Sequence, residues 1–211
     1  MQLELWTNRI AINYKVVWEV WFSSRLCLLV YSEMPKLYFD RLRKLHDSLG
    51  IPKEYFDSCK LPLYLEPASL KETELDFYDR PQRLTPNALN AWTSMRSAAS
   101  REGCVIFLIS AFRDLEYQCD VIARKVDQGR SLEEVLRVNA APGYSEHHTG
   151  RAIDIGTVNC DVLIEDFDKT PAFSWLEKNA VQFGFVMTYP KKNASQINYE
   201  PWHWCFQEAG N

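Results

Sequence analysis

The sequence predicts an α+β protein in which a small antiparallel sheet packs against helices on one side. Three observations support this class. Helical patterns and short apolar runs are mixed along the chain without the regular alternation that builds a parallel sheet. Neither a Gly-rich dinucleotide-binding fingerprint nor a P-loop occurs. The composition, 46% hydrophobic and 25% charged over 211 residues, is that of a globular domain.

Charge and hydropathy exclude two kinds of partner. The formal charge of −4 is opposite to that of a general nucleic-acid binder, so we expect no nucleic-acid partner. No apolar run reaches the roughly 18–20 residues of a membrane helix, so we expect no membrane span. The six cysteines contain no CxxC pair, and we expect mostly buried thiols, leaving their disulfide state open.

The N-terminal part is expected to lie outside the main domain. Residues 1–33 contain apolar patches broken by charges and no recognisable signal peptide, and one hypothesis is that they are an extension upstream of a native start at Met34. Residues 34–84 are expected to form a helical segment and an arm. Leucines at helical spacing predict a helix over 35–49, a second short helix is expected over 52–59, and residues 60–84 are expected to form a long loop.

The main domain is expected to cover residues 85–211, and its elements follow from helix caps and apolar runs. Thr85-Pro86 and Thr170-Pro171 each place a capping hydroxyl before a proline, which predicts a helix start. Asp114 is expected to cap a helix that ends near Gln128, and Ser131 with Glu134 predicts a capping box. The remaining apolar runs predict strands over 104–112, 151–156, 185–188 and 202–206.

Polar residues in the C-terminal half have the composition of a metal site. His147, Asp154 and His203 offer two imidazoles and one carboxylate, a donor set suited to catalytic zinc. The two-residue strand period puts Asp154 on one face with Ala152 and Gly156, small residues that leave room for a ligand. The same period puts His203 and Cys205 opposite the face of the neighbouring aromatic residues.

Two further residues have types that suit hydrolysis. Glu200 lies three residues before His203 and is suited to act as a general base beside a metal. Arg113 directly follows the predicted buried strand, where a guanidinium can clamp a carboxylate or stabilise an oxyanion. The other two histidines are expected to be structural or exposed, His148 at the surface or pocket rim and His46 on an exposed helix face.

These motifs resemble the VanY-type D-alanyl-D-alanine carboxypeptidase family, zinc peptidases related to the VanX dipeptidases and the LdcB-type L,D-carboxypeptidases. The resemblance covers roughly residues 85–206. It is carried by Ser145-x-His147-x-x-Gly150-x-Ala152-x-Asp154, by Glu200-Pro201-Trp202-His203, by Ser110-Ala111-Phe112-Arg113 with the following Tyr117 and Gln118, and by Phe183-Gly184-Phe185-Val186 with Tyr189-Pro190.

The resemblance implies a hedgehog/DD-peptidase-like zinc fold and a role for each residue. His147, Asp154 and His203 would bind Zn²⁺, and Glu200 would be the base. Arg113 would polarise the scissile carbonyl or hold substrate, and Gln118 and Ser145 would line the substrate pocket.

The implied activity is removal of the terminal D-amino acid from peptidoglycan stem peptides or muropeptides. The alternatives are L,D-carboxypeptidase, D,D-dipeptidase or endopeptidase action, and a zinc-containing wall-binding module without turnover. That substrate class points to the cell envelope, but without a readable export signal the cytoplasm stays open. Oligomeric state is not indicated.

The sequence departs from the family pattern at four positions, which bears on specificity. Ala111, Phe112 and Asp114 replace the usual Gly, Tyr and Ser around the arginine, which changes the groups available to hold a peptide end. Cys205 stands where the family often has arginine, on the face of His203. This cysteine would loosen substrate binding or place a thiol near the metal.

Overall fold

The computed structural model describes residues 25–195 and 197–208. The chain divides into two compact units, Met1–Arg41 and Leu42–Asn211. Helix α2 spans Arg25–Leu49, so it begins ten residues before the predicted helix over 35–49. The expected boundaries at residues 33 and 84 stay predictions, and residues 1–24 lie outside the described part. None of the described helices combines the length and apolar character of a membrane span.

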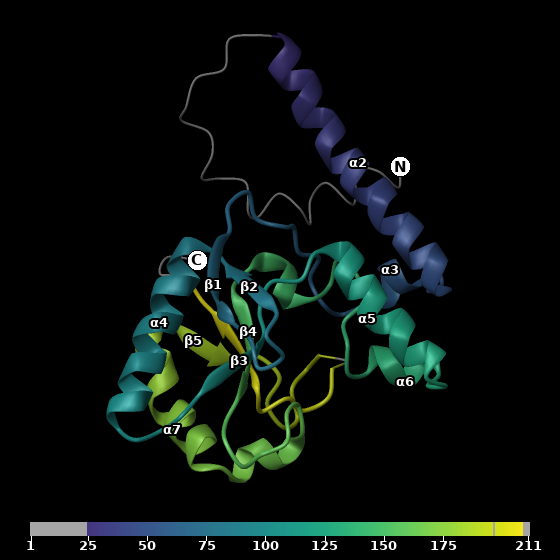
Figure 1. Cartoon of the computed structure of the whole chain (residues 1–211). Coiled ribbons are helices and arrows are strands. Elements are labelled where there is room, and N and C mark those ends of the chain that lie inside the picture. The colour runs from purple at the N-terminus through teal and green to yellow at the C-terminus, as the bar shows by residue number, and fades with distance from the viewer. Residues whose placement is uncertain (1–24, 196, 209–211) are drawn as a thin grey trace. The chain divides into compact units, whose positions relative to one another are not determined.

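The larger unit is organised around a four-stranded antiparallel sheet (Figure 1). Its strand order is β3, β4, β6, β5, so strands distant in sequence lie side by side at its centre. The predicted strands are confirmed, although the apolar run over 104–112 forms a strand only over its central residues, Phe107–Ser110. The bounds are β3 Phe107–Ser110, β4 Ala152–Gly156, β5 Phe185–Met187 and β6 His203–Phe206.

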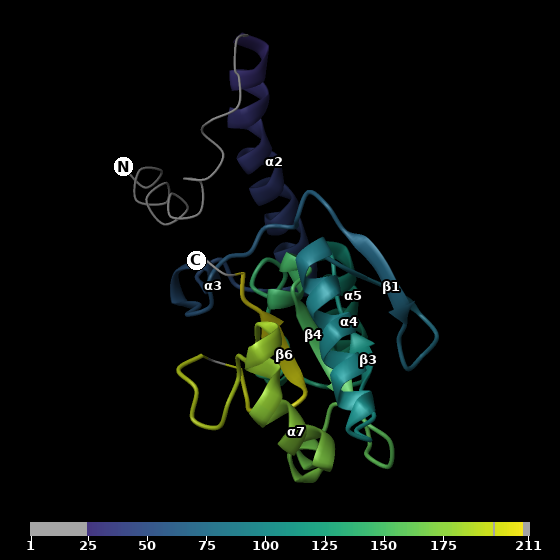
Figure 2. The same cartoon turned by 90° about the vertical axis from the view of Figure 1, so that its left-hand side faces the viewer.

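Helices α4 (Pro86–Arg101) and α7 (Pro171–Asn179) cover one face of this sheet (Figures 1 and 2). Their fully buried residues join the inward-facing side chains of β4 and β6 in one core, which includes Trp92, Met95, Leu176, Ile153, Ile155 and Trp204. Burial of such side chains contributes about 1.5–3 kcal/mol each. The predicted α+β class is therefore confirmed. Helices α5 (Leu115–Asp127) and α6 (Leu132–Leu136) lie on the opposite side of the sheet in Figure 1.

Three of the four predicted helix caps are present. The side chain of Asp114 accepts a hydrogen bond from Tyr117 N, that of Thr170 accepts one from Phe173 N, and Ser131 forms the expected capping box. The helix start predicted at Thr85-Pro86 is confirmed, with Thr85 at the N-cap position, but the Thr85 hydroxyl makes no capping hydrogen bond and is buried without a partner among the described residues. Short 3₁₀ helices complete the unit: η2 Glu146–Thr149, η3 Glu165–Lys169 and η4 Ala180–Phe183.

The loop predicted over residues 60–84 is wrong in its second half, where the chain forms a hairpin. Strand β1 (Lys71–Leu75) pairs with β2 (Pro81–Leu84) in an antiparallel two-stranded sheet. The turn is closed by Asp76, whose Oδ1 accepts hydrogen bonds from the N–H groups of Tyr78 and Arg80. This hairpin depends on one buried carboxylate rather than on apolar alternation, so its sequence lacks the usual strand pattern.

Two histidines were expected at the surface, and both are buried. His46 is 1% exposed and donates from Nε2 to Pro142 O at 2.8 Å. Its ring stacks on Phe56, which follows the start of the short helix α3 (Tyr55–Ser58). His148 is 0% exposed. Helical spacing therefore misassigned His46, because a neighbouring helix and the loop around residue 142 cover that face of α2 within the larger unit.

Candidate metal centre and substrate pocket

Asp154 and His203 come together because β4 pairs with β6. The register places these two residues directly opposite each other, and Ile153 opposite Trp204 on the core side. The predicted division into a core face and a polar face is therefore confirmed for both strands. The expected space at Gly156 is absent, since a Cβ there would lie 2.6 Å from Phe107 and 2.8 Å from Ile109.

His147 reaches the same place from η2, the turn that precedes β4. Gly150 ends this turn with a φ of 63°, a left-handed conformation that glycine adopts without steric cost. The reversal brings the end of η2 back over β4. His147, 1% exposed, consequently faces Asp154 across the turn.

The potential ligand atoms of His147, Asp154 and His203 all lie within 4.8 Å of one another. His147 Nε2 is 3.3 Å from Asp154 Oδ2, and His203 Nδ1 is 3.1 Å from Asp154 Oδ1. His147 Nε2 makes no well-aligned hydrogen bond to any described group although it is buried. Two imidazole nitrogens and one carboxylate, converging with a buried unpartnered nitrogen, fit a zinc ion with one coordination position left open.

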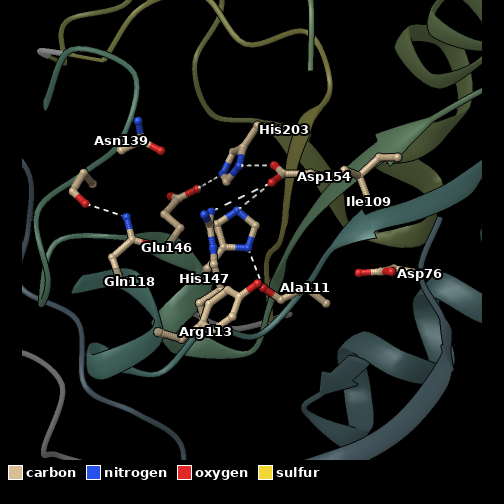
Figure 3. A network of polar contacts seen from close by, with 12 residues as sticks. Asp76, Ile109, Ala111, Arg113, Gln118, Asn139, Glu146, His147, Asp154 and His203 are labelled. Atoms are coloured by element: carbon tan, nitrogen blue, oxygen red, sulfur yellow. Dashed lines mark hydrogen bonds and ion pairs between the residues drawn. The ribbon is translucent and has the colours of Figure 1, made fainter. Parts of the chain in front are cut away.

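The other nitrogen of each imidazole is held by an oxygen of the protein (Figure 3). His147 Nδ1 donates to Ala111 O at 2.6 Å, and His203 Nε2 lies 2.9 Å from Glu146 Oε2. Such outer bonds fix the orientation of a metal-binding histidine and leave its second nitrogen free for the metal. The two histidines are therefore presented through Nε2 of His147 and Nδ1 of His203.

The pKa values of His147 and His203 are shifted in opposite directions. Burial, helped by the positive charge of Arg113, lowers the pKa of His147 to about 4. Burial alone would also lower the pKa of His203, but its hydrogen bonds to Asp154 and Glu146 outweigh it and raise that pKa to about 10. Interactions with His147, followed by those with His203, overcome burial and hold the pKa of Asp154 well below its usual value. Two buried carboxylates thus require a positive charge at this place, which a metal ion would supply.

Glu146 is the residue of this centre that sequence reasoning missed. It is 7% exposed and also accepts a hydrogen bond from Tyr64 at 3.3 Å. Its position between Ser145 and His147 in the motif was a usable signal. Its contact with His203, 57 residues away, was not readable from spacing.

A second chain of contacts supports His147 from the hairpin. Asp76 Oδ2 accepts from Gln82 Nε2 at 2.8 Å, and Gln82 Oε1 accepts from Ala111 N at 2.8 Å. The carbonyl of Ala111 then accepts from His147. Asp76 and Gln82 are buried, so a hairpin that was expected to be a loop fixes the backbone that orients a potential ligand.

Arg113 is tied to η2 through its backbone. Arg113 N donates to His147 O at 3.3 Å, and Arg113 O accepts from His148 Nδ1 at 2.6 Å. His148 Nε2 accepts from Gly143 N, which fixes its tautomer. The guanidinium of Arg113 lies 3.8 Å from Asp154 Oδ2. It therefore points at the centre rather than at Asp114, which caps α5.

All the predicted site residues line one pocket of about 460 Å³. Glu200 is 9% exposed there and is not one of the clustered ligand residues. Burial, reinforced by Asp154, raises the pKa of Glu200 to about 7 against the opposing charges of His203 and Arg113. The structure brings together Arg113, Gln118, Ser145, His147, Asp154, Glu200 and His203.

Gln118 and Cys205 have distinct environments near the centre. Gln118 is 1% exposed, donates from Nε2 to Ala140 O, and leaves Oε1 without a partner among the described residues. Cys205 is buried, and burial raises the pKa of its thiol, with the carboxylate of Glu146 adding to the shift. It is not among the clustered ligand residues. The five cysteines whose side chains are described are all free.

Comparison with known proteins gives one family. The VanY family, D-alanyl-D-alanine carboxypeptidase, matches residues 81–209. YodJ of Bacillus subtilis (strain 168) is 32% identical over 150 residues, which are 68% of this chain and 55% of YodJ. The D-alanyl-D-alanine carboxypeptidase of Enterococcus faecium is 31% identical over 116 residues, 53% of this chain and 33% of that protein. The chain thus spans about half, or less, of these relatives.

Solved structures share the fold. The LdcB LD-carboxypeptidase superposes with a TM-score of 0.59 at 31% identity, covering 67% of this chain and 69% of that one. The vancomycin resistance D,D-dipeptidase VanXYg gives the same TM-score at 24% identity, covering 70% of this chain and 60% of that one, which shows the fold alone. The family match covers more than half of the residues and includes the four-stranded sheet and the histidine centre just described. The chain belongs to the VanY family of D-alanyl-D-alanine carboxypeptidases.

Proposed function

We propose that the chain is a zinc metallopeptidase that removes the terminal D-amino acid from peptidoglycan stem peptides. One observation carries the proposal: His147, Asp154 and His203 converge in a pocket that Glu200 also lines, in a chain of the VanY family. In this proposal the three residues bind Zn²⁺ through His147 Nε2, His203 Nδ1 and the Asp154 carboxylate. When bound, the ion supplies a Lewis acid that polarises a carbonyl and activates water.

Glu200 is proposed as the general base. Its carboxylate, with a pKa raised to about 7, is suited to take a proton from the attacking water and to pass it to the leaving nitrogen. No hydrogen bond or ion pair among the described residues occupies this carboxylate, which leaves it available to substrate and water. Arg113 is proposed to stabilise negative charge on the carbonyl oxygen, because its guanidinium already lies 3.8 Å from Asp154.

Gln118 and Ser145 are proposed to hold the peptide. The unpartnered Oε1 of Gln118 is a buried acceptor in the pocket wall, suited to a substrate N–H. Ser145 is 4% exposed, lines the same pocket, and its side chain does not cap η2. Its hydroxyl is therefore suited to a second substrate contact.

The test uses zinc-loaded wild type and the Glu200→Gln variant with stem pentapeptide and tetrapeptide, followed by mass spectrometry. We expect wild type to release one alanine from the pentapeptide. We expect Glu200→Gln to bind zinc normally and to react about 10²–10⁴-fold more slowly. Zinc-loaded wild type that releases nothing from either peptide would refute the proposal and favour a wall-binding module.

L,D-carboxypeptidase action is the second candidate. The observation in its favour is the likeness to the LdcB LD-carboxypeptidase at 31% identity over two thirds of each chain. Cleavage of the tetrapeptide without cleavage of the pentapeptide would select this activity. Release of a dipeptide, or an internal cut, would instead indicate dipeptidase or endopeptidase action.

A further inference from the structure

The pocket has a charge opposite to that of the chain. The whole chain carries a formal charge of −4, but five basic residues and only two acidic ones line the pocket. One of the two acids, Asp154, is already bonded to the histidines. The pocket lining therefore contains more basic than acidic side chains. The basic residues are Arg80, Arg113, Arg124, Lys125 and Arg130.

The four arginines of the pocket each have a partner or are exposed. Arg80 pairs with Asp76 at 2.7 Å and donates to Tyr117 and to Ile109 O. Arg124 is exposed and donates to a carbonyl of its own helix, and Arg130 is exposed at the rim. Arg113 points at Asp154. None of these four is both half-buried and without an acidic partner.

Lys125 combines these two properties. It is half-buried near the end of α5, and its Nζ donates one hydrogen bond, to Asn139 Oδ1 at 2.9 Å. Asn139 is itself buried and held by Val135 O, so the ammonium is held at a fixed place. No carboxylate among the described residues forms an ion pair with Lys125. Two of its three donor hydrogens stay available.

The surroundings of Lys125 favour the binding of an anion. Burial and the positive charges of Arg113 and Arg130 lower its pKa, against a weaker opposing effect of Glu200 and Asp154. A half-buried ammonium beside two guanidinium groups is unfavourable until an anion enters. Lys125 and the proposed base Glu200 line the same pocket, so an anion bound at Lys125 would belong to the molecule being cleaved.

We propose that Lys125 is the anchor for a carboxylate of the substrate. The inference rests on the proposed peptidase function and deepens it by naming a residue that determines specificity. Arg113 acts at the scissile carbonyl, and Lys125 holds a charged group of the same peptide further along α5. The carboxylate has two possible sources: the free C-terminus of the peptide, or an acidic side chain within the stem. Each source gives a different result when one carboxylate is replaced by an amide.

The experiment compares three peptides of the same stem: the free acid, the C-terminal amide, and a peptide in which the side-chain carboxylate is an amide. Values of kcat and KM are measured by mass spectrometry for wild type, Lys125→Met and Lys125→Arg, all loaded with zinc. Lys178→Met, an exposed lysine outside the pocket, is the matched control. Zinc content and circular dichroism establish that each variant is folded.

We expect wild type to prefer the free acid over one of the two amides by about 10- to 100-fold, the range for a hydrogen-bonded charge. Lys125→Met should lose this preference through a higher KM for the free acid, with the amide unaffected. Lys125→Arg should retain it. The identity of the discriminated amide assigns the carboxylate to the C-terminus or to the side chain.

Two outcomes overturn the inference in different ways. If wild type cleaves the free acid and Lys125→Met keeps the full preference, Lys125 is no anchor although the peptidase function stands. If wild type cleaves none of the peptides, the proposed function fails and the inference fails with it.

Discussion

At the histidine end of the pocket two buried carboxylates, Asp154 and Glu146, face one imidazole, that of His203. At the α5 end the pocket is lined by Lys125 and Arg130, and neither forms an ion pair with a carboxylate of the described residues. The first region has its counter-charges built into the fold. In the second region, the counter-charges for the basic side chains would have to come from a bound ligand. The difference separates a part of the pocket suited to fixed chemistry from a part suited to recognising a ligand.

The largest effect is expected when the contact between Glu146 and His203 at the histidine end of the pocket is weakened. Glu146→Gln keeps the size of the side chain but removes the charge that orients His203. We expect zinc affinity to fall about 10- to 100-fold, as for other outer-shell carboxylates. Competition with a chelator measures it, and exposed Glu177→Gln is the control. Unchanged affinity in Glu146→Gln would show that the two ends of the pocket do not differ in this respect.

The second prediction concerns the hydrogen bonds that connect the hairpin to the backbone of Ala111. Gln82→Leu removes the partner of Ala111 N and one partner of Asp76, leaving buried polar groups unpaired. The free energy of unfolding should fall by about 1–3 kcal/mol. Urea denaturation of the metal-free protein measures it, with exposed Gln182→Leu as the reference. Equal stability of the two variants would contradict a structural role for this chain of contacts.

The third prediction concerns the pH dependence of stability that arises from His46, a buried histidine outside the pocket. Burial lowers the pKa of His46 below 6.5, and its Nδ1 has no partner among the described residues. Below pH 6.5 the unfolded chain binds a proton that the folded chain resists, so stability falls as pH falls and recovers above 6.5. The midpoints of urea unfolding of wild type and of His46→Phe, measured from pH 5 to pH 8, test this pH dependence. A variant with the same pH slope as wild type would rule out His46 as a source of the dependence.

The smallest effect is expected at the α5 end. Lys125→Met loses one hydrogen bond to Asn139 but also relieves the repulsion from Arg113 and Arg130. The free energy of unfolding without ligand should therefore change by less than about 0.5 kcal/mol. A loss as large as that of Gln82→Leu would mean that Lys125 serves the fold rather than a ligand.

The sequence was sufficient for residues whose positions follow from local periodicity. Alternation in two strands put Asp154 and His203 on the faces that the register brings together, and Asp114 was readable as a helix cap. His147 was selected with Asp154 and His203 as a metal donor from its residue type and was supported by the motif resemblance, and its turn ends in a left-handed glycine.

Other features depend on contacts between distant segments and had no local pattern. The hairpin after residue 70 is closed by one carboxylate, so its strands show no apolar alternation. Glu146 meets His203 only when η2 approaches β6. His46 was misassigned because its helical position says nothing about what packs over it.

The buried position of His148 affects which functions would be lost together if η2 were damaged. The histidine next to His147 holds the carbonyl of Arg113, while the carbonyl of His147 holds the Arg113 amide. One short turn therefore sets the positions of both the His147 imidazole, a candidate metal ligand, and the Arg113 guanidinium. Damage to that turn would not produce an enzyme that keeps its metal and merely binds peptide badly. It would remove both capacities together, so partial loss of function should arise from α5 and not from η2.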